Sequence, residues 1–216
     1  MKNKSVIGVG AGGHAKVIID ILLKEGIYDI KGMVDINTNL KGTSILGIPI
    51  ISGEGELIRL YDENIRLAFV AVASISDTKN NKKTFEYVQG LGFEIINVVH
   101  ESAVIAGSVK MGCGNRIFAG TIINPDSVLG NNVVINTGAI VDHDCRIEDH
   151  AQIGPGAQLA GNVNVGEGSF IGLGASVIQG VRIGKYSIIG AGSAVINNVA
   201  DNVTIGGVPA KQLKSI

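Results

Sequence analysis

The sequence predicts two domains of different fold class, an α/β domain followed by an all-β parallel β-helix. Apolar strands alternate with amphipathic helical segments through about the first 100 residues. A six-residue aliphatic repeat then runs through most of the remaining chain. A glycine-rich loop after the first predicted strand adds a functional signal to the α/β domain.

The six-residue repeat is the stronger structural signal. An aliphatic side chain recurs at every sixth position, and the residue two places before it is mostly small, as at Ala139, Cys145 and Ala151. Glycine often follows the aliphatic residue, where it permits the backbone of a turn. The sixteen repeating positions are Ile105, Met111, Ile117, Ile123, Leu129, Ile135, Val141, Ile147, Ile153, Leu159, Val165, Ile171, Val177, Ile183, Ile189 and Val195.

A period of six suits neither an α-helix nor an ordinary strand, and it is the hexapeptide signature of a parallel β-helix. Three hexads form one triangular coil, so residues eighteen apart stack and the repeat gives roughly five coils. The alternative, a chance run of alternating strands, would not keep phase through so many repeats. Each coil buries its inner face only against its neighbours, so we expect stability to depend on stacking.

We expect the α/β domain over residues 1–100 and the β-helix, with a short polar C-terminal cap, over residues 101–216. The boundary lies where the six-residue phase begins. Strands that alternate with helices indicate a parallel sheet. The expected strands are 5–9, 31–35, 48–51, 67–73 and 93–98, and the expected helices are 14–24, 53–62 and 77–90.

Composition restricts the functions to consider. A net charge of −1 gives no electrostatic case for binding nucleic acid or a membrane surface. No apolar run approaches the roughly 20 residues of a membrane span. The run at 5–9 is too short for a signal peptide, so we expect a cytoplasmic protein. Cys113 and Cys145 are expected to be reduced and structural rather than a disulfide or metal pair, and no metal site is expected.

The glycine-rich loop spans residues 8–13 and matches G-x-G-x-x-G, and Asp35 ends the next predicted strand. Such a loop brings backbone N–H groups to a phosphate at a helix N-terminus, with a carboxylate placed for ribose hydroxyls. The domain has room for one mononucleotide-binding half. We therefore favour a nucleotide or nucleotide-sugar site over a redox dinucleotide site or a tight turn without ligand. His14 can reach such a ligand from the helix start, or it can be an ordinary exposed residue.

A histidine lies on a predicted turn of the β-helix, where side chains face outward. In the segment 141–145, Asp144 can hold one nitrogen of the His143 imidazole and leave the other free as a base. A solvated turn is the alternative for such a pair. His150 is a second outward candidate on the next wall, and we interpret it as structural or peripheral.

These motifs together resemble a bacterial family, the left-handed β-helix sugar acetyltransferases with a Rossmann-like N-terminal half. The family includes sialic acid O-acetyltransferases and N-acetyltransferases of UDP-4-amino-4,6-dideoxy sugars, the PglD type. The resemblance covers nearly the whole chain. It is carried by the segments 10–14, 34–35, 135–138, 142–145, 159–163 and 207–211.

The resemblance implies acetyl-CoA as the donor and a homotrimer with active sites between adjacent β-helices. It implies that His143 deprotonates the acceptor, that Asp144 raises its basicity and that Asn136 lies near the reacting groups. By hexad register, the contacts to the pantetheine and acetyl groups are expected at Gln152, Gly161, Leu173 and Ala191. The nucleotide-linked sugar is expected near Gly12, Gly13, His14, Asp35 and Ala73.

Two departures from the family pattern concern ligand contacts. Gln152 stands where relatives often have a histidine, with His150 two residues earlier, which weakens the inference at the acetyl group. Ala73 stands where relatives have glycine, which leaves room for a different sugar or base.

The favoured function is acetyl-CoA-dependent N-acetylation of a nucleotide-linked 4-amino-4,6-dideoxy sugar by direct attack. His143 would be the general base, and backbone N–H groups such as that of Gly161 would stabilise the oxyanion. The alternatives are O-acetylation of a sialic-acid-like sugar, a non-catalytic nucleotide-sugar-binding trimer, and an NAD-dependent oxidoreductase, for which an adequate second half-fold is missing.

Overall fold

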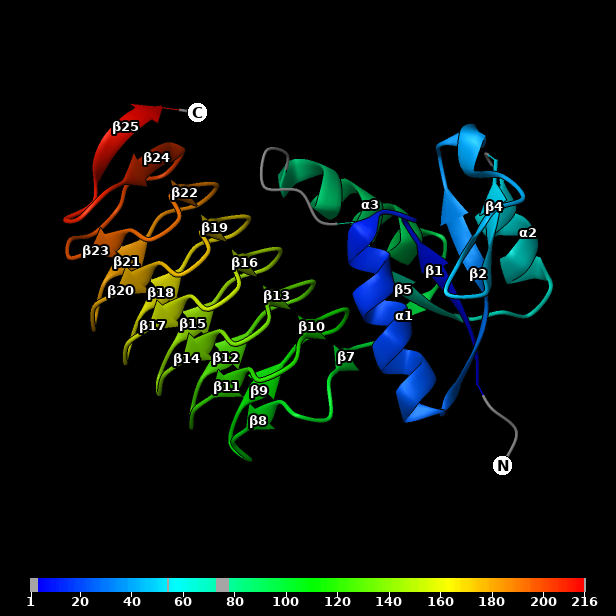
Figure 1. Ribbon diagram of the computed structural model, residues 1–216, viewed down its shortest axis with the longest axis horizontal. Helices are drawn as coiled ribbons and strands as arrows, with labels where there is room; N and C mark the ends of the chain where they lie inside the picture. The colour runs from blue at the N-terminus through cyan, green and yellow to red at the C-terminus, as the bar shows by residue number, and fades with distance from the viewer. Residues whose placement is uncertain (1–3, 54, 73–77, 216) are drawn as a thin grey trace. The chain divides into compact units, whose positions relative to one another are not determined.

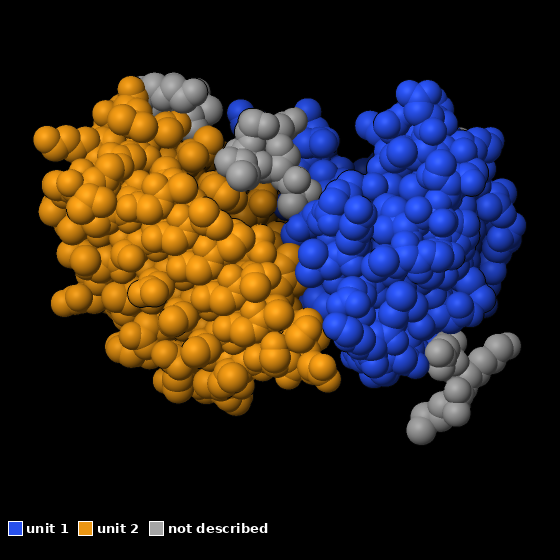
Figure 2. Space-filling view, in the orientation of Figure 1, with its two compact units in different colours: residues 1–98 blue, residues 99–216 orange. Residues whose placement is uncertain are grey.

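The computed structural model describes residues 4–53, 55–72 and 78–215, and the chain divides into two compact units, residues 1–98 and 99–216 (Figures 1 and 2). The predicted fold class is confirmed: an α/β unit is followed by a parallel β-helix. Within the described residues, no helix has the length and apolarity needed to cross a membrane.

The described part of the first unit holds a six-stranded sheet in the order β3-β4-β2-β1-β5-β6. All its neighbouring strands are parallel except β3 and β4, which form an antiparallel hairpin that the sequence reasoning missed. The strands are β1 (Lys4–Val9), β2 (Tyr28–Asp35), β3 (Ser44–Ile45), β4 (Ile48–Ser52), β5 (Leu67–Val70) and β6 (Glu94–Ile95). The helices are α1 (Gly13–Glu25), η1 (Thr38–Leu40), α2 (Glu56–Asp62) and α3 (Thr78–Gly90).

Helix α1 follows the glycine loop and has one apolar face. Its buried residues include Ala15, Ile18 and Leu22, whose spacing of three and four residues puts them on one side of the helix. Gly26 ends the helix in the left-handed conformation, with φ of 68°, and its N–H donates to the carbonyl of Leu22. The N-terminus of α1 is therefore fixed directly after β1.

The second unit is a triangular coil with three walls. Wall I consists of β7 (Val98–Val99), β10 (Arg116–Ile117), β13 (Val134–Ile135), β16 (Gln152–Ile153), β19 (Phe170–Ile171), β22 (Ile188–Ile189), β24 (Val203–Gly206) and β25 (Lys211–Ser215). Wall II consists of β8 (Val104–Ile105), β11 (Ile122–Ile123), β14 (Ile140–Val141), β17 (Gln158–Leu159), β20 (Ser176–Val177) and β23 (Ala194–Val195). Wall III consists of β9 (Lys110–Met111), β12 (Val128–Leu129), β15 (Arg146–Ile147), β18 (Asn164–Val165) and β21 (Arg182–Ile183).

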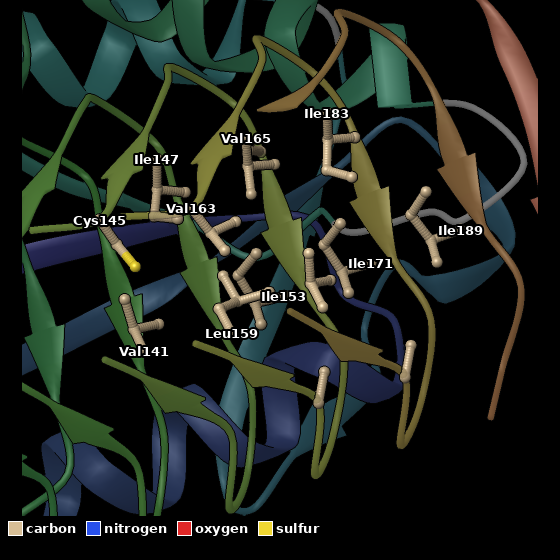
Figure 3. Packing of buried hydrophobic residues seen from close by; sticks show 14 of the residues in the cluster. Val141, Cys145, Ile147, Ile153, Leu159, Val163, Val165, Ile171, Ile183 and Ile189 are labelled. Carbon is tan, nitrogen blue, oxygen red and sulfur yellow. The ribbon is translucent and has the colours of Figure 1, made fainter. Parts of the chain in front are cut away.

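The strands pair with partners eighteen residues away, as the six-residue repeat requires. On wall I, for example, Ile117 pairs with Ile135 and Ile135 with Ile153. The repeating aliphatic residues from Ile117 to Val195 are buried and form one continuous core, part of which Figure 3 shows. Each such side chain contributes roughly 1.5–3 kcal/mol when it is fully buried.

The corners between the walls explain the polar residues of the repeat. At most of these turns one residue adopts the left-handed conformation, which Asp, Asn and Gly tolerate best. Between walls II and III this position is Asp126, Asp144, Asn162 and Gly180 in successive coils. The C-terminal cap, expected as an irregular polar segment, is instead an antiparallel hairpin of β24 and β25 that extends wall I.

Candidate functional site

The candidate base lies on the corner between walls II and III, which we call the His143 corner (residues 124–126, 142–144, 160–162 and 178–180). The side chains of His143 and Asp144 are each 59% exposed, and Nδ1 of His143 lies 2.8 Å from Oδ2 of Asp144. Asp144 has φ of 60°, the left-handed conformation that Asp126, Asn162 and Gly180 also adopt at this position in neighbouring coils. The sequence-predicted pair therefore exists, and it faces outward.

The electrostatics of this pair favour a basic imidazole. The hydrogen bond to Asp144, followed by the charge of Asp142, raises the pKa of His143 above its usual 6.5. Because a carboxylate only accepts, Nδ1 carries the hydrogen in this pair. In the neutral imidazole Nε2 is then unprotonated and able to take a proton.

Gly161 lies one coil above His143 and leaves room for its ring. A Cβ built at Gly161 would lie 2.6 Å from Cε1 and 2.7 Å from Nε2 of His143, so the imidazole lies directly against the glycine. Among the described residues, no hydrogen bond from the Gly161 N–H is found. This N–H and the Nε2 atom of His143 thus belong to the same corner of adjacent coils.

Two residues of this corner were missed by the sequence reasoning. Oδ1 of Asp142 accepts a hydrogen bond from the backbone N–H of His143 and another from Nδ2 of Asn124, both at 2.8 Å. Asn124 and Asp142 are eighteen residues apart, so the stacking period alone would have paired them.

Three other candidates lie on the corner between walls I and II, which we call the Asn136 corner (residues 136–139, 154–157, 172–175 and 190–193). Oδ1 of Asn136 accepts from the backbone N–H of Thr137 at 2.8 Å. Leu173 is 58% exposed, and Ala191, eighteen residues later, is also exposed. The candidates for chemistry and for cofactor binding are therefore divided between two corners of one β-helix.

The structure argues against a ligand contact at Gln152, because this side chain is only 4% exposed on wall I. The expectation that His150 faces outward is wrong: it is 5% exposed on the corner between walls III and I. Nδ2 of Asn132 lies 2.9 Å from Nδ1 of His150, while Oδ1 of the same amide accepts from Arg116. His150 is therefore part of a buried polar cluster.

That cluster contains a buried cation. Arg116 is 1% exposed, and burial lowers its pKa to about 9. Its Nη2 donates to both the carbonyl and the side-chain oxygen of Asn132. The orientation of the Asn132 amide follows, since its oxygen faces Arg116 and its nitrogen faces His150.

Cys145 points into the coil between Val141 and Ile147, as predicted (Figure 3). Burial raises the pKa of its thiol to about 11, so it is not a thiolate near neutral pH. Its Sγ lies 3.3 Å from the carbonyl oxygen of Ala160. Cys145 is thus unsuited to carry a covalent acyl intermediate.

In the first unit, the structure brings Asp35 to the glycine loop. Oδ2 of Asp35 accepts from the Ala11 N–H at 2.6 Å, and Oδ1 accepts from the Asn37 N–H at 2.8 Å. Gly10 has φ of 97°, and a Cβ there would lie 2.7 Å from Val72, so this turn requires glycine. The carboxylate therefore fixes the loop, in addition to any ligand that it contacts.

The other predicted residues of this unit divide into three cases. A Cβ at Gly12 or Gly13 would meet nothing within 4 Å, so the start of α1 is open. His14 is half-buried in the first turn of α1. Ala73 lies outside the described residues. The sequence reasoning also passed over Ile36, which follows Asp35 and is 95% exposed.

Comparison with known proteins connects both units to sugar acetyltransferases. The family description "PglD N-terminal domain" matches residues 5–88. A variant of perosamine N-acetyltransferase from Caulobacter crescentus, in complex with CoA and GDP-perosamine, is 39% identical over 98% of this chain and 97% of that chain, with a TM-score of 0.91. The acetyltransferase domain of PglB from Neisseria gonorrhoeae, in complex with acetyl coenzyme A, is 32% identical over 98% of this chain and 100% of that chain, with a TM-score of 0.87.

Two further relatives are more distant or only partly covered. WeeI from Acinetobacter baumannii is 26% identical over 97% of this chain and 100% of that chain, with a TM-score of 0.83. An uncharacterized protein of Acanthamoeba polyphaga mimivirus is 34% identical over 128 residues, which are 57% of this chain and 23% of that protein. This chain therefore spans only about a quarter of the viral relative.

Proposed function

Because the chain belongs to the PglD-type family of β-helix sugar N-acetyltransferases, we propose that it transfers the acetyl group of acetyl-CoA to the amine of a nucleotide-linked 4-amino-4,6-dideoxy sugar. The observation that carries the proposal is the His143–Asp144 pair, with 2.8 Å between Nδ1 and Oδ2 on an exposed corner. The Caulobacter and Neisseria relatives, crystallised with CoA and with acetyl coenzyme A, support the donor.

The reaction needs no covalent enzyme intermediate. The neutral amine attacks the thioester carbonyl carbon, and a tetrahedral intermediate collapses with cleavage of the C–S bond. His143 takes a proton from the nitrogen at Nε2, while Asp144 holds Nδ1–H and stabilises the imidazolium. The N–H of Gly161 is the candidate donor to the developing oxyanion.

The acceptor's nucleotide is assigned to the first unit. The open space at Gly12 and Gly13, where α1 begins and next to His14, suits a diphosphate at the helix N-terminus. Asp35 uses one lone pair on the Ala11 N–H of the glycine loop and one on the Asn37 N–H. A carboxylate has about four lone pairs, so Asp35 can also accept from a ribose hydroxyl.

We further propose a homotrimer in which each site combines the His143 corner of one chain with the Asn136 corner of another. Exposed apolar side chains on the β-helix support a subunit interface there. Val104 on wall II is 63% exposed, and Ile178 and Ile196, which directly follow wall II strands, are also exposed. The trimer is checked by light scattering, and a stable monomer at micromolar concentration would contradict it.

The catalytic proposal is tested with His143→Ala. The side chain is exposed on a corner, so its removal opens no core cavity, and the fold and the CoA affinity are expected to stay unchanged. General-base assistance is typically worth about 10²–10⁴ in rate, so kcat at saturating substrates should fall within that range. If the variant keeps more than about a tenth of wild-type activity, His143 is not the base.

The shared site has its own test by complementation. His143→Ala and Asn136→Ala chains are unfolded together and refolded as a mixture. In a mixed trimer one interface carries neither substitution, so activity is expected to return above that of either parent. A mixture that stays as inactive as its parents would place both residues in a single chain's site.

A further inference from the structure

One carboxylate oxygen of Asp142 accepts hydrogen bonds from the protein, and the other accepts none from the described residues. Both hydrogen bonds to this carboxylate, from the His143 N–H and from Asn124 Nδ2, go to Oδ1. Among the described residues, no group donates to Oδ2. The side chain is half-buried, on the same corner as the imidazole. Asp142 thus holds the His143 backbone and still presents a second carboxylate oxygen.

The charge around His143 is strongly one-sided. Asp142 precedes it, Asp144 follows it, and in the coil above its ring lies against Gly161, which has no side chain. Within the described residues, no lysine or arginine forms an ion pair with either carboxylate. The hydrogen bond from Asn124, followed by that from the His143 N–H, lowers the pKa of Asp142, so it is ionised at neutral pH. The His143 corner thus holds three carboxyl groups, those of Asp126, Asp142 and Asp144, and no lysine or arginine.

A corner with this charge distinguishes two kinds of acceptor. Alkyl amines hold a proton over much of the neutral range, as the reference values for amino groups show, whereas a hydroxyl is uncharged. Two unit charges about 4 Å apart attract by about 1 kcal/mol in water and by more where solvent is partly excluded. A single carboxylate can therefore change the relative affinity of the two acceptors by about tenfold.

We propose that Asp142 makes the site selective for an amine over a hydroxyl acceptor, with Oδ2 accepting a hydrogen bond from the sugar ammonium while Oδ1 positions His143. This inference rests on the proposed function and assigns its specificity to a particular residue. In the reaction, His143 takes one proton from the ammonium, and the neutral amine attacks the carbonyl carbon. The C–S bond then breaks, the departing thiolate takes the second proton from nitrogen, and the imidazolium returns its proton to solvent.

The variant Asp142→Asn separates charge from position, because the amide oxygen can still accept both of the hydrogen bonds that Oδ1 accepts now. Asn124→Ala is the matched variant, since it removes one donor and leaves the charge in place. Binding is measured by calorimetry with a UDP- or GDP-linked 4-amino-4,6-dideoxy sugar and with its 4-hydroxy counterpart. Turnover of the amino sugar and the melting temperature are measured on the same proteins.

Wild type is expected to bind the amino sugar more tightly than the hydroxy sugar, and Asp142→Asn should reduce this preference about tenfold with no change in acetyl-CoA affinity. Asn124→Ala should keep the preference and lower kcat. The inference is overturned if wild type binds both sugars equally, or if Asp142→Asn keeps the preference. In either case the proposed function still holds, provided that wild type acetylates the amino sugar. Absence of both binding and turnover in wild type would instead reject the proposed function, and the inference with it.

Discussion

Replacement of Gly161 by alanine tests the geometry of the candidate base more directly than removal of the base itself. The three described atoms nearest to a Cβ at this position all belong to the His143 imidazole, at 2.6, 2.7 and 3.2 Å. The backbone of Gly161 does not lie in the left-handed region, so alanine brings no backbone strain. The substitution therefore acts on the position of one exposed ring.

The expected magnitude follows from the displacement. Carbon atoms in contact lie roughly 3.5–4.0 Å apart, so the ring must move by about 1 Å from its present 2.6 Å contact. A misplacement of about 1 Å at a reacting group can cost about 10²-fold in rate. We expect kcat to fall by about two decades, with little change in melting temperature because the ring can move into solvent.

The assay is release of CoA thiol at saturating acetyl-CoA and amino sugar. Gly107→Ala is the matched control: it lies two coils earlier at the same corner register as His143, and a Cβ there would meet nothing within 4 Å. This control should keep wild-type activity. The reasoning is refuted if Gly161→Ala keeps more than about a third of the wild-type kcat, since no base displaced by about 1 Å would remain so effective.

The remaining predictions concern titration, the nucleotide site and the buried cluster. The pKa of His143 is raised, mostly by Asp144 and less by Asp142. In a pH–rate profile, kcat should therefore fall on the acid side with a midpoint above pH 6.5. Asp144→Asn should move that midpoint to lower pH. Asp35→Ala removes the acceptor of two backbone N–H groups, and a hydrogen bond to a charged group contributes about 1.5–3 kcal/mol. The acceptor KM should rise by one to two decades, with less effect in Asp35→Asn and none on the acetyl-CoA KM; an unchanged acceptor KM removes Asp35 from the site. His150→Leu deprives Asn132 of a buried partner and should cost about 1–3 kcal/mol, seen as a lower melting temperature with unchanged kcat, whereas a large loss of kcat would contradict a structural role.

The repeat made the β-helix predictable, because its period constrains both the inward residues and the pairing. Once Ile117, Ile135 and Ile153 are recognised as one stack, the parallel register of wall I follows. The β3–β4 hairpin was missed for a local reason: Ser44–Ile45 is too short to show an alternating pattern. The last predicted strand divided into β6 and β7 because pairing partners, which the sequence does not display, decide where a strand ends.

The candidate site was predicted in part. His143 and Asp144 are neighbours in the chain, so their pairing could be inferred from the turn that they occupy. The burial of His150 and Gln152 could not be inferred in the same way, because a corner or wall position has no fixed exposure in this repeat. Asn132 shows the reason: it occupies the same corner register as His150, and each is buried by side chains from other coils.

At the His143 corner, one residue meets two requirements, a left-handed backbone for the turn and a carboxylate beside the imidazole. The chemistry can therefore be placed there without disturbing the core. The corner needs a left-handed residue after position 143, and Asp144 supplies it with φ of 60°. Asparagine adopts this conformation as readily as aspartate, and Asn162 does so in the next coil. Asp144→Asn therefore keeps the turn and removes the charge, so a loss of activity in that variant is attributable to the carboxylate. Asp144→Val would break both requirements together, because a β-branched residue at positive φ strains the turn, and its phenotype would not separate chemistry from fold.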